Sequence, residues 1–236
     1  MNMKTTTASG RIYFLDELRG ITLISMILYH FMWDLVYIAG FDIPWYHTSI
    51  AHIWQQSICQ TFILLSGFSW SLGHHPIRRG LIVSGGGALV TLVTVLFLPE
   101  DAVFFGVLTL IGFSMILTVL IDRFLSEPLK LSRRPVLAWI FLGLGIFMFL
   151  LFLPAQTGHM TDFAALLSGE ASWRNGPALP AGLYNQTLAL PEGIYRGYLL
   201  SCLGFPGKGF ASTDYFPLIP WFFLYTAGFF LYKLWT

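Results

Sequence analysis

Charged residues are scarce in this sequence. Asp, Glu, Lys and Arg make up 11% of its 236 residues, whereas hydrophobic residues make up 56%. Soluble globular domains carry about 25% charged residues. The composition therefore excludes an ordinary soluble domain and predicts a protein that crosses a lipid bilayer several times.

Cysteines and metal-ligand clusters are also few. Two cysteines, Cys59 and Cys202, make no disulfide framework, and no residues with metal-ligand spacing appear, so we expect no metal. A net charge of +1 gives no reason to expect a nucleic-acid partner. The sequence has no Gly-x-Ser-x-Gly elbow and no phosphate-binding loop, and its Ser-Gly-Gly-Gly-Ala segment at 84–88 is typical of close helix packing.

Long apolar runs dominate what remains. They predict an all-α integral membrane protein with a single transmembrane domain over residues 1–236, a bundle of about six helices. The expected spans lie near residues 18–38, 51–72, 80–98, 102–121, 135–154 and 215–235. Residues 155–214 are rich in Gly and Pro and predict a long loop, in which 193–203 fits a short amphipathic helix. Pro217 and Pro220 are expected to bend or delay the start of the last span.

Basic residues orient the predicted bundle. Ten of the 13 Lys and Arg residues lie in the N-terminal flank, the second-to-third and fourth-to-fifth loops, and the C-terminus: Lys4, Arg11, Arg19, Arg78, Arg79, Arg123, Lys130, Arg133, Arg134 and Lys233. Cytoplasmic loops carry an excess of Lys and Arg. Both termini are therefore predicted to be cytoplasmic, and the loop 155–214 external.

The first span carries four ionisable residues, Asp16, Arg19, His30 and Asp34. At 100° per residue they fall within an arc of about 60°. The rise from Asp16 to Asp34 is about 27 Å, close to the hydrocarbon thickness of a bilayer. Such groups are costly in lipid unless they face a polar interior. We expect this face to line one; the alternative is that the charges sit at the membrane edges and anchor the helix.

Two histidines are candidates for a general base. His30 and Asp34 stand four residues apart on one helix face, a spacing at which a carboxylate orients an imidazole. His47 lies in the first external loop, after a Pro-Trp-Tyr sequence that is also typical of an interfacial aromatic belt. An oriented histidine is what general-base chemistry requires.

Further polar residues extend the candidate site. His52, Gln56 and Gln60 lie in the polar first half of the second span, where amides either join helices or line an acceptor pocket that opens outward. Asp214 precedes the last span on the same predicted side. Arg78 and Arg79 belong to a small cytoplasmic basic patch, which meets lipid headgroups or binds an anion such as a nucleotide phosphate.

The opening pattern Arg11-x4-Asp16-x2-Arg19-Gly20-Ile21, followed by Met26 and His30-x3-Asp34, resembles the heparan-alpha-glucosaminide N-acetyltransferase catalytic domain family. Its bacterial members are the domain-of-unknown-function-1624 proteins, within the wider group of membrane acyltransferases. Three further segments are similar: 62–72, 104–117 and 203–221. In many bacterial members a histidine stands where this chain has Thr109.

The resemblance implies an acetyl-CoA-dependent N- or O-acyltransferase. Acetyl-CoA would be the cytoplasmic co-substrate, and an amino sugar or related saccharide or small molecule outside would be the acceptor. By position His47 matches the active histidine of the lysosomal relative, with His30 as its rival. The donor phosphates would be held by Arg19, Arg78 and Arg79, and Asp16 would position Arg19.

A transporter or a non-catalytic membrane scaffold is the alternative. In that interpretation the polar stripe of the first span serves permeation or helix packing. The sequence further leads us to expect a bacterial inner membrane as the location and the lipid bilayer as the main partner, and it leaves a homodimer open.

Overall fold

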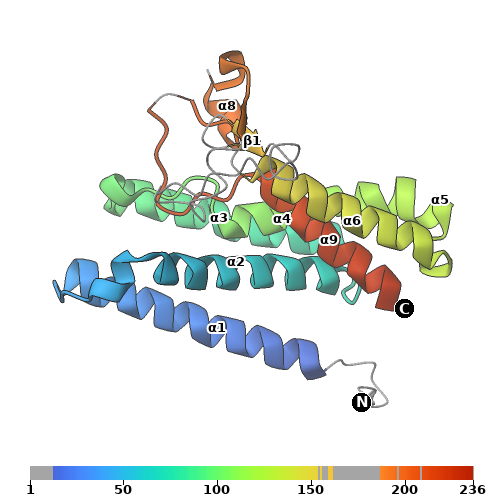
Figure 1. The fold of residues 1–236 in the computed structure, drawn as a ribbon, viewed down its shortest axis with the longest axis horizontal. Helices are drawn as coiled ribbons and strands as arrows, with labels where there is room; N and C mark the ends of the chain where they lie inside the picture. The colour runs from blue at the N-terminus through green and yellow to red at the C-terminus, as the bar shows by residue number, and fades with distance from the viewer. Residues whose placement is uncertain are drawn as a thin grey trace. The chain divides into compact units, whose positions relative to one another are not determined.

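The computed structural model describes residues 13–153, 155, 159–161, 187–195, 197–207 and 209–235. Most of this part of the chain lies in six long helices (Figure 1). They are α1 (Tyr13–Trp33), α2 (Ser49–Trp70), α3 (Pro76–Phe97), α4 (Val107–Ile121), α6 (Pro135–Phe152) and α9 (Leu218–Trp235). The predicted all-α fold class is confirmed.

Short elements join and cap these helices. They are a π turn η1 (Asp34–Ile38), η2 (Pro44–His47), η3 (Pro99–Asp101), η4 (Asp122–Ser126), α5 (Glu127–Leu129), η5 (Leu131–Arg133), η7 (Glu192–Tyr195) and α8 (Tyr198–Ser201). Two three-residue strands, β1 (His159–Thr161) and β2 (Thr187–Ala189), pair antiparallel, with His159 opposite Ala189.

Five helical segments of the described chain are long and apolar enough to cross a membrane: Tyr13–Ile38, Pro76–Phe97, Val107–Leu129, Pro135–Phe152 and Leu218–Trp235. The protein is therefore an integral membrane protein. The remaining predicted span, 51–72, forms helix α2 but is not among the five. The polar residues of its first half, among them His52 and Gln56, lower its hydropathy.

In three places the helices of the structure differ from the predicted ranges. Helix α1 already includes Tyr13, the first described residue, whereas the predicted span starts near 18. The fourth begins at Val107 rather than at 102, because the backbone N–H of Phe104 is held by Ser212 Oγ at 2.9 Å. The helix expected at 193–203 is divided into η7 and α8, since Gly197 is extended.

The start of the last helix follows the expectation from its prolines. The backbone of Ile219, between Pro217 and Pro220, is not helical (φ −98°, ψ 125°). Regular helix continues from Pro220 onward, so the prolines delay the span, as predicted.

Packing divides the chain into two compact units, residues 1–65 and 66–236, and α2 runs from the first into the second. The single domain over 1–236 stays a prediction. In the first unit a small core of Val36, Tyr46 and Ala51 is covered by the partly buried side chains Tyr29, Met32, Trp33 and Ile43. This core joins the end of α1 to the start of α2.

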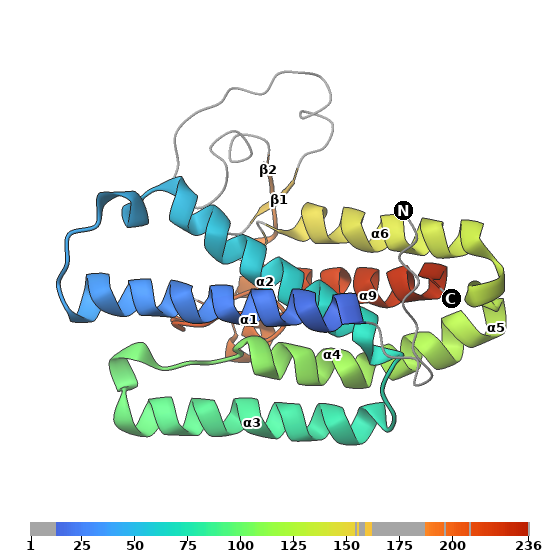
Figure 2. The ribbon, with the colours of Figure 1, turned by 90° about the horizontal axis from the view of Figure 1, so that it is seen from below.

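In the second unit α3 lies along α4 and α6 lies along α9, and α4 and α9 also touch (Figure 2). Small residues allow the first of these contacts. A Cβ on Gly80 would come 2.8 Å from the Gly112 carbonyl oxygen, and one on Gly87 would overlap Thr109. Close packing was the interpretation of the glycine run. Gly87 packs closely, whereas nothing lies within 4 Å of a Cβ on Gly85 or Gly86.

The end of α2 packs into the same unit. A Cβ on Gly67 would overlap the backbone carbonyl of Tyr225 on α9. The indole Nε1 of Trp70 donates a hydrogen bond to the carbonyl oxygen of Met115 on α4 at 2.9 Å. Trp70 also packs edge-on against Phe229 of α9, with ring centroids 5.3 Å apart. The core of this unit therefore lies where α2, α4 and α9 meet.

Candidate functional site

His47 lies against tyrosine rings in the first unit. It is the last residue of η2, and its imidazole is exposed. The ring stands at 88° to that of Tyr37 with centroids 6.1 Å apart, and at 81° to that of Tyr46 at 6.4 Å. These edge-on contacts limit how the imidazole turns, which is the first requirement for a base that acts on one proton.

Tyr46 is the anchor of this arrangement. It is 6% exposed, and its hydroxyl donates to the backbone carbonyl of Tyr29 at 3.4 Å. Burial, and after it the neighbouring Tyr29, raises the pKa of the Tyr46 phenol above its ordinary value. The phenol therefore stays neutral and keeps its proton for this hydrogen bond.

His30 belongs to the same aromatic cluster. Tyr29 lies with its ring centroid 5.5 Å from that of Tyr46 and 6.2 Å from that of His30. Tyr29 also packs edge-on against Trp54 of α2, whose Nε1 donates to Ser25 Oγ at 2.8 Å. Tyr29 and Tyr46 thus connect the two candidate bases. Sequence reasoning missed both tyrosines, because aromatic residues near this loop were interpreted only as a membrane belt.

His30 and Asp34 are not in contact. Across the part of the chain that the structure describes, neither a hydrogen bond nor an ion pair joins them, and both side chains are exposed. Helix α1 ends at Trp33, and Asp34 opens the π turn η1. The helical register therefore changes at the carboxylate, and orientation of His30 by Asp34 stays a prediction.

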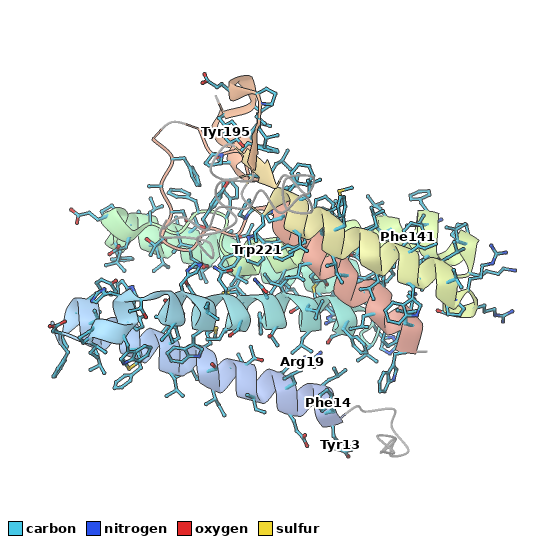
Figure 3. All side chains as sticks on the ribbon, viewed as in Figure 1. Tyr13, Phe14, Arg19, Phe141, Tyr195 and Trp221 are labelled. Atoms are coloured by element: carbon cyan, nitrogen blue, oxygen red, sulfur yellow. The ribbon has the colours of Figure 1, made fainter. Side chains whose placement is uncertain are left out.

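Asp16 and Arg19 are brought together near the start of α1. Arg19 Nη1 lies 3.3 Å from Asp16 Oδ1, and each side chain is about one third exposed, at 35% and 36%. Figure 3 labels Arg19 one to two turns beyond Tyr13 and Phe14. The carboxylate thus restricts the guanidinium. Arg11, the first residue of the opening pattern, lies outside the described residues.

The polar residues of α2 are half-buried. His52, Gln56 and Gln60 follow one another at intervals of four residues and so share a helix face. Within the described residues none of the three makes a hydrogen bond, whereas Trp54 of the same helix does. The choice between helix contact and acceptor pocket stays open.

Asp214 caps helix α4 from a distant loop. Its Oδ2 accepts a hydrogen bond from the backbone N–H of Val107 at 3.2 Å. Val107 is the first residue of α4, and Gly106 before it has no side chain to cap the helix. Ser212 holds the backbone of Phe104 next to it. Asp214 therefore has a structural role as a helix cap, whereas the sequence suggested that it binds the acceptor substrate.

Arg78 and Arg79 differ although they are neighbours in α3. Arg78 is exposed and Arg79 is half-buried. The guanidinium of Arg79 lies over Gly73 in the turn before α3, where a Cβ would overlap it. Its Nη1 is buried and has no hydrogen-bond partner among the described residues. Arg79 is therefore the more buried member of the pair.

No group of three or more His, Cys, Asp or Glu that would hold a metal ion occurs within the described residues. The described candidate residues thus comprise two imidazoles beside tyrosines in the first unit, those of His30 and His47, and the partly buried guanidinium of Arg79 in the second.

The chain belongs to the family described as heparan-alpha-glucosaminide N-acetyltransferase, catalytic. The family profile matches residues 11–236, which is almost the whole sequence. Searches of curated proteins and of solved structures found no match. The suspected family is confirmed, and an acetyltransferase-like membrane protein is the class that it defines.

Proposed function

We propose that this protein transfers an acetyl group from cytoplasmic acetyl-CoA to an amino sugar or related acceptor on the other side of a bacterial inner membrane. The observation that carries the proposal is the family match over residues 11–236, on a chain with five membrane-spanning helices. This reaction requires a general base near the acceptor and cationic side chains near the phosphates of the donor.

The base accepts a proton from the acceptor amine or hydroxyl. As that nitrogen or oxygen attacks the thioester carbonyl, the carbon–sulfur bond breaks and CoA leaves with its sulfur electron pair. His47 is our first candidate for the base and His30 the second, with Asp34 as its orienting carboxylate. The tyrosine cluster supports both candidates, because the ring of Tyr29 lies beside His30 and the ring of Tyr46 lies beside His47.

The donor carries phosphate groups, which cationic side chains hold. Arg19, restricted by Asp16, and separately Arg78 and Arg79 are the candidates. The unpartnered Nη1 of Arg79 fits a phosphate oxygen. Bound acetyl-CoA supplies the activated acetyl group. For the acceptor we propose His52, Gln56, Gln60 and Asp214, of which Asp214 already holds the end of α4.

The test is turnover by the purified full chain in nanodiscs with acetyl-CoA and glucosamine. Wild type should release CoA faster when glucosamine is present. Loss of a general base costs about a hundredfold or more in rate. We therefore expect such a loss in either His47→Ala or His30→Ala, but not in both to the same degree.

His74→Ala is the matched control, since His74 is also exposed but lies on the predicted cytoplasmic side. It should keep full turnover. If wild type neither binds acetyl-CoA nor releases CoA, while all variants melt at the same temperature, the acetyltransferase proposal is wrong. The polar stripe of α1 would then be examined as a transport path.

A further inference from the structure

The connection between α4 and α6 forms one end of the second unit (Figure 2). It consists of η4, α5 and η5, and it ends at Arg134, directly before Pro135 begins α6. Hydrogen bonds fix its backbone. The N–H of Lys130 donates to the carbonyl oxygen of Glu127 at 3.1 Å, and the N–H of Arg133 donates to that of Lys130 at 2.8 Å. The connection therefore has a defined backbone geometry.

Leu131 anchors the last turn of this connection to the helices. It is 1% exposed, and η5 lies in contact with both α6 and α9. Its neighbours Lys130 and 132–134 are exposed. A turn closed by a hydrogen bond between residues i and i+3 brings their Cα atoms within about 7 Å. Such bonds join Lys130 to Arg133 and Leu131 to Arg134, so three cationic side chains extend from one basic turn, Lys130 to Arg134.

The positive charge of the basic turn is not balanced within the described residues. Asp122, at the start of η4, already forms an ion pair with Lys233, with Oδ1 and Nζ 2.9 Å apart. Glu127 is the second acidic residue of the connection, and Arg123 adds a fourth basic residue to it. Among the described residues no ion pair involves any of the three cations of the basic turn. The connection therefore presents a net positive surface.

Large apolar side chains flank the basic turn. Phe124 is 73% exposed, and Trp139, in the second turn of α6, is 61% exposed. Both residues belong to helical segments that are long and apolar enough to cross a membrane. Exposed apolar side chains on such segments face lipid, and Trp is enriched where a bilayer meets water. These two residues therefore place the basic turn at the level of the lipid headgroups.

We propose that the basic turn binds the headgroups of anionic phospholipids. A cluster of four or more Lys and Arg directly beside a membrane-spanning helix attracts anionic lipids electrostatically. The guanidinium groups of Arg133 and Arg134 can each donate two hydrogen bonds to one phosphate, and the ammonium group of Lys130 adds a point charge. Bound lipid then fixes the depth at which the neighbouring ends of α4 and α6 lie. The surface shares no residue with the proposed acetyl transfer and does not depend on that activity.

The test compares the lipids next to two positions of the same protein. In a Cys59→Ser and Cys202→Ser background, Ser132→Cys carries a fluorophore in the basic turn, and Glu100→Cys carries it in the acidic turn η3. Both positions are exposed. The full chain is placed in nanodiscs with equal amounts of phosphatidylglycerol and phosphatidylcholine. In each measurement one of the two lipids bears a quencher of the fluorophore on its headgroup.

Phosphatidylglycerol should quench more than phosphatidylcholine at Ser132→Cys but not at Glu100→Cys. Each basic residue near a membrane surface contributes about fivefold to the attraction of anionic lipid. Arg133→Gln or Arg134→Gln should therefore lower the preference for phosphatidylglycerol by up to about fivefold. The matched pair Arg133→Lys and Arg134→Lys keeps the charge and should keep most of the preference. Raising the salt from about 0.1 to about 1 M shortens the Debye length from about 10 to about 3 Å, so it should reduce the preference.

Equal quenching by the two lipids at Ser132→Cys, or the same preference at both positions, would rule out the proposed lipid site. So would a preference that survives Arg133→Gln combined with Arg134→Gln and does not respond to salt, because charge would then not select the lipid. If inorganic phosphate removes the preference at unchanged ionic strength, the turn binds soluble anions and the proposal is wrong. Loss of the preference in the Gln variants alone supports it. Since both arginines are exposed, all variants should melt near the wild-type temperature.

Discussion

At the residue scale, the start of a helix in this protein is capped by a side chain that is distant from it in the sequence. Asp214 is the clearest case, because its carboxylate takes the place of a cap that Gly106 cannot provide. We expect Asp214→Ala to lower stability by about 1 kcal/mol, the usual value of a helix cap. The neighbouring exposed Thr213→Ala is the control. Thermal melting of the detergent-purified protein measures both.

Asp214→Asn separates the cap from an acceptor-binding role. An amide oxygen still accepts the Val107 N–H, so this variant should keep most of the stability that Asp214→Ala loses. If Asp214 also binds a cationic amino-sugar acceptor, Asp214→Asn should raise KM for the acceptor. Unchanged KM with lowered stability in Asp214→Ala would leave the residue with the structural task alone.

Tyr46 allows the ring and the hydroxyl to be tested separately. Its ring contacts Tyr29, Tyr37 and His47, whereas its hydrogen bond to the Tyr29 carbonyl is long at 3.4 Å. Tyr46→Ala should therefore cost about 3–5 kcal/mol, as loss of a buried aromatic ring does. Tyr46→Phe should cost no more than about 1 kcal/mol. A larger loss in Tyr46→Phe would show that the hydroxyl, and not the ring, holds this cluster.

At the scale of elements, close approach of helices depends on particular glycines. Gly67→Ala should push the end of α2 away from α9, since its new Cβ would overlap the Tyr225 carbonyl. Overpacking of this kind costs about 1–3 kcal/mol. Gly85→Ala on α3 is the matched control, because nothing lies within 4 Å of its Cβ. We expect it to melt at or slightly above the wild-type temperature. Equal melting of the two variants would contradict this contact.

The helices were predictable because bilayer thickness fixes the length of each apolar run. What the sequence did not reveal depends on contacts between distant segments. Residues 102–106 are apolar enough to continue a span, yet they are not helical, and Ser212 Oγ accepts a hydrogen bond from the backbone N–H of Phe104. The candidate histidines were found from their chemistry. Their connection through Tyr29 and Tyr46 joins residues that no local pattern relates.

At the scale of the whole molecule, the direction of the proposed acetyl transfer depends on which ends of the helices face the cytoplasm. The connections at the two ends of α4 differ in charge. The turn η3 contains Glu100 and Asp101 and no basic residue, whereas residues 122–134 contain four basic residues, Arg123, Lys130, Arg133 and Arg134. Figure 2 shows α5 at the opposite end of α4 from the α3–α4 connection. Because basic loops remain cytoplasmic, the η3 end should face outward.

Cysteine labelling in intact cells tests this orientation. In a background of Cys59→Ser and Cys202→Ser, Glu100→Cys should react with a membrane-impermeant maleimide added outside. Arg133→Cys should react only after the membrane is permeabilised. Both positions are exposed, so a difference in labelling reports sidedness rather than burial. The opposite result would place Arg79 on the outer face, away from cytoplasmic CoA. The donor site would then have to be sought at the other end of these helices.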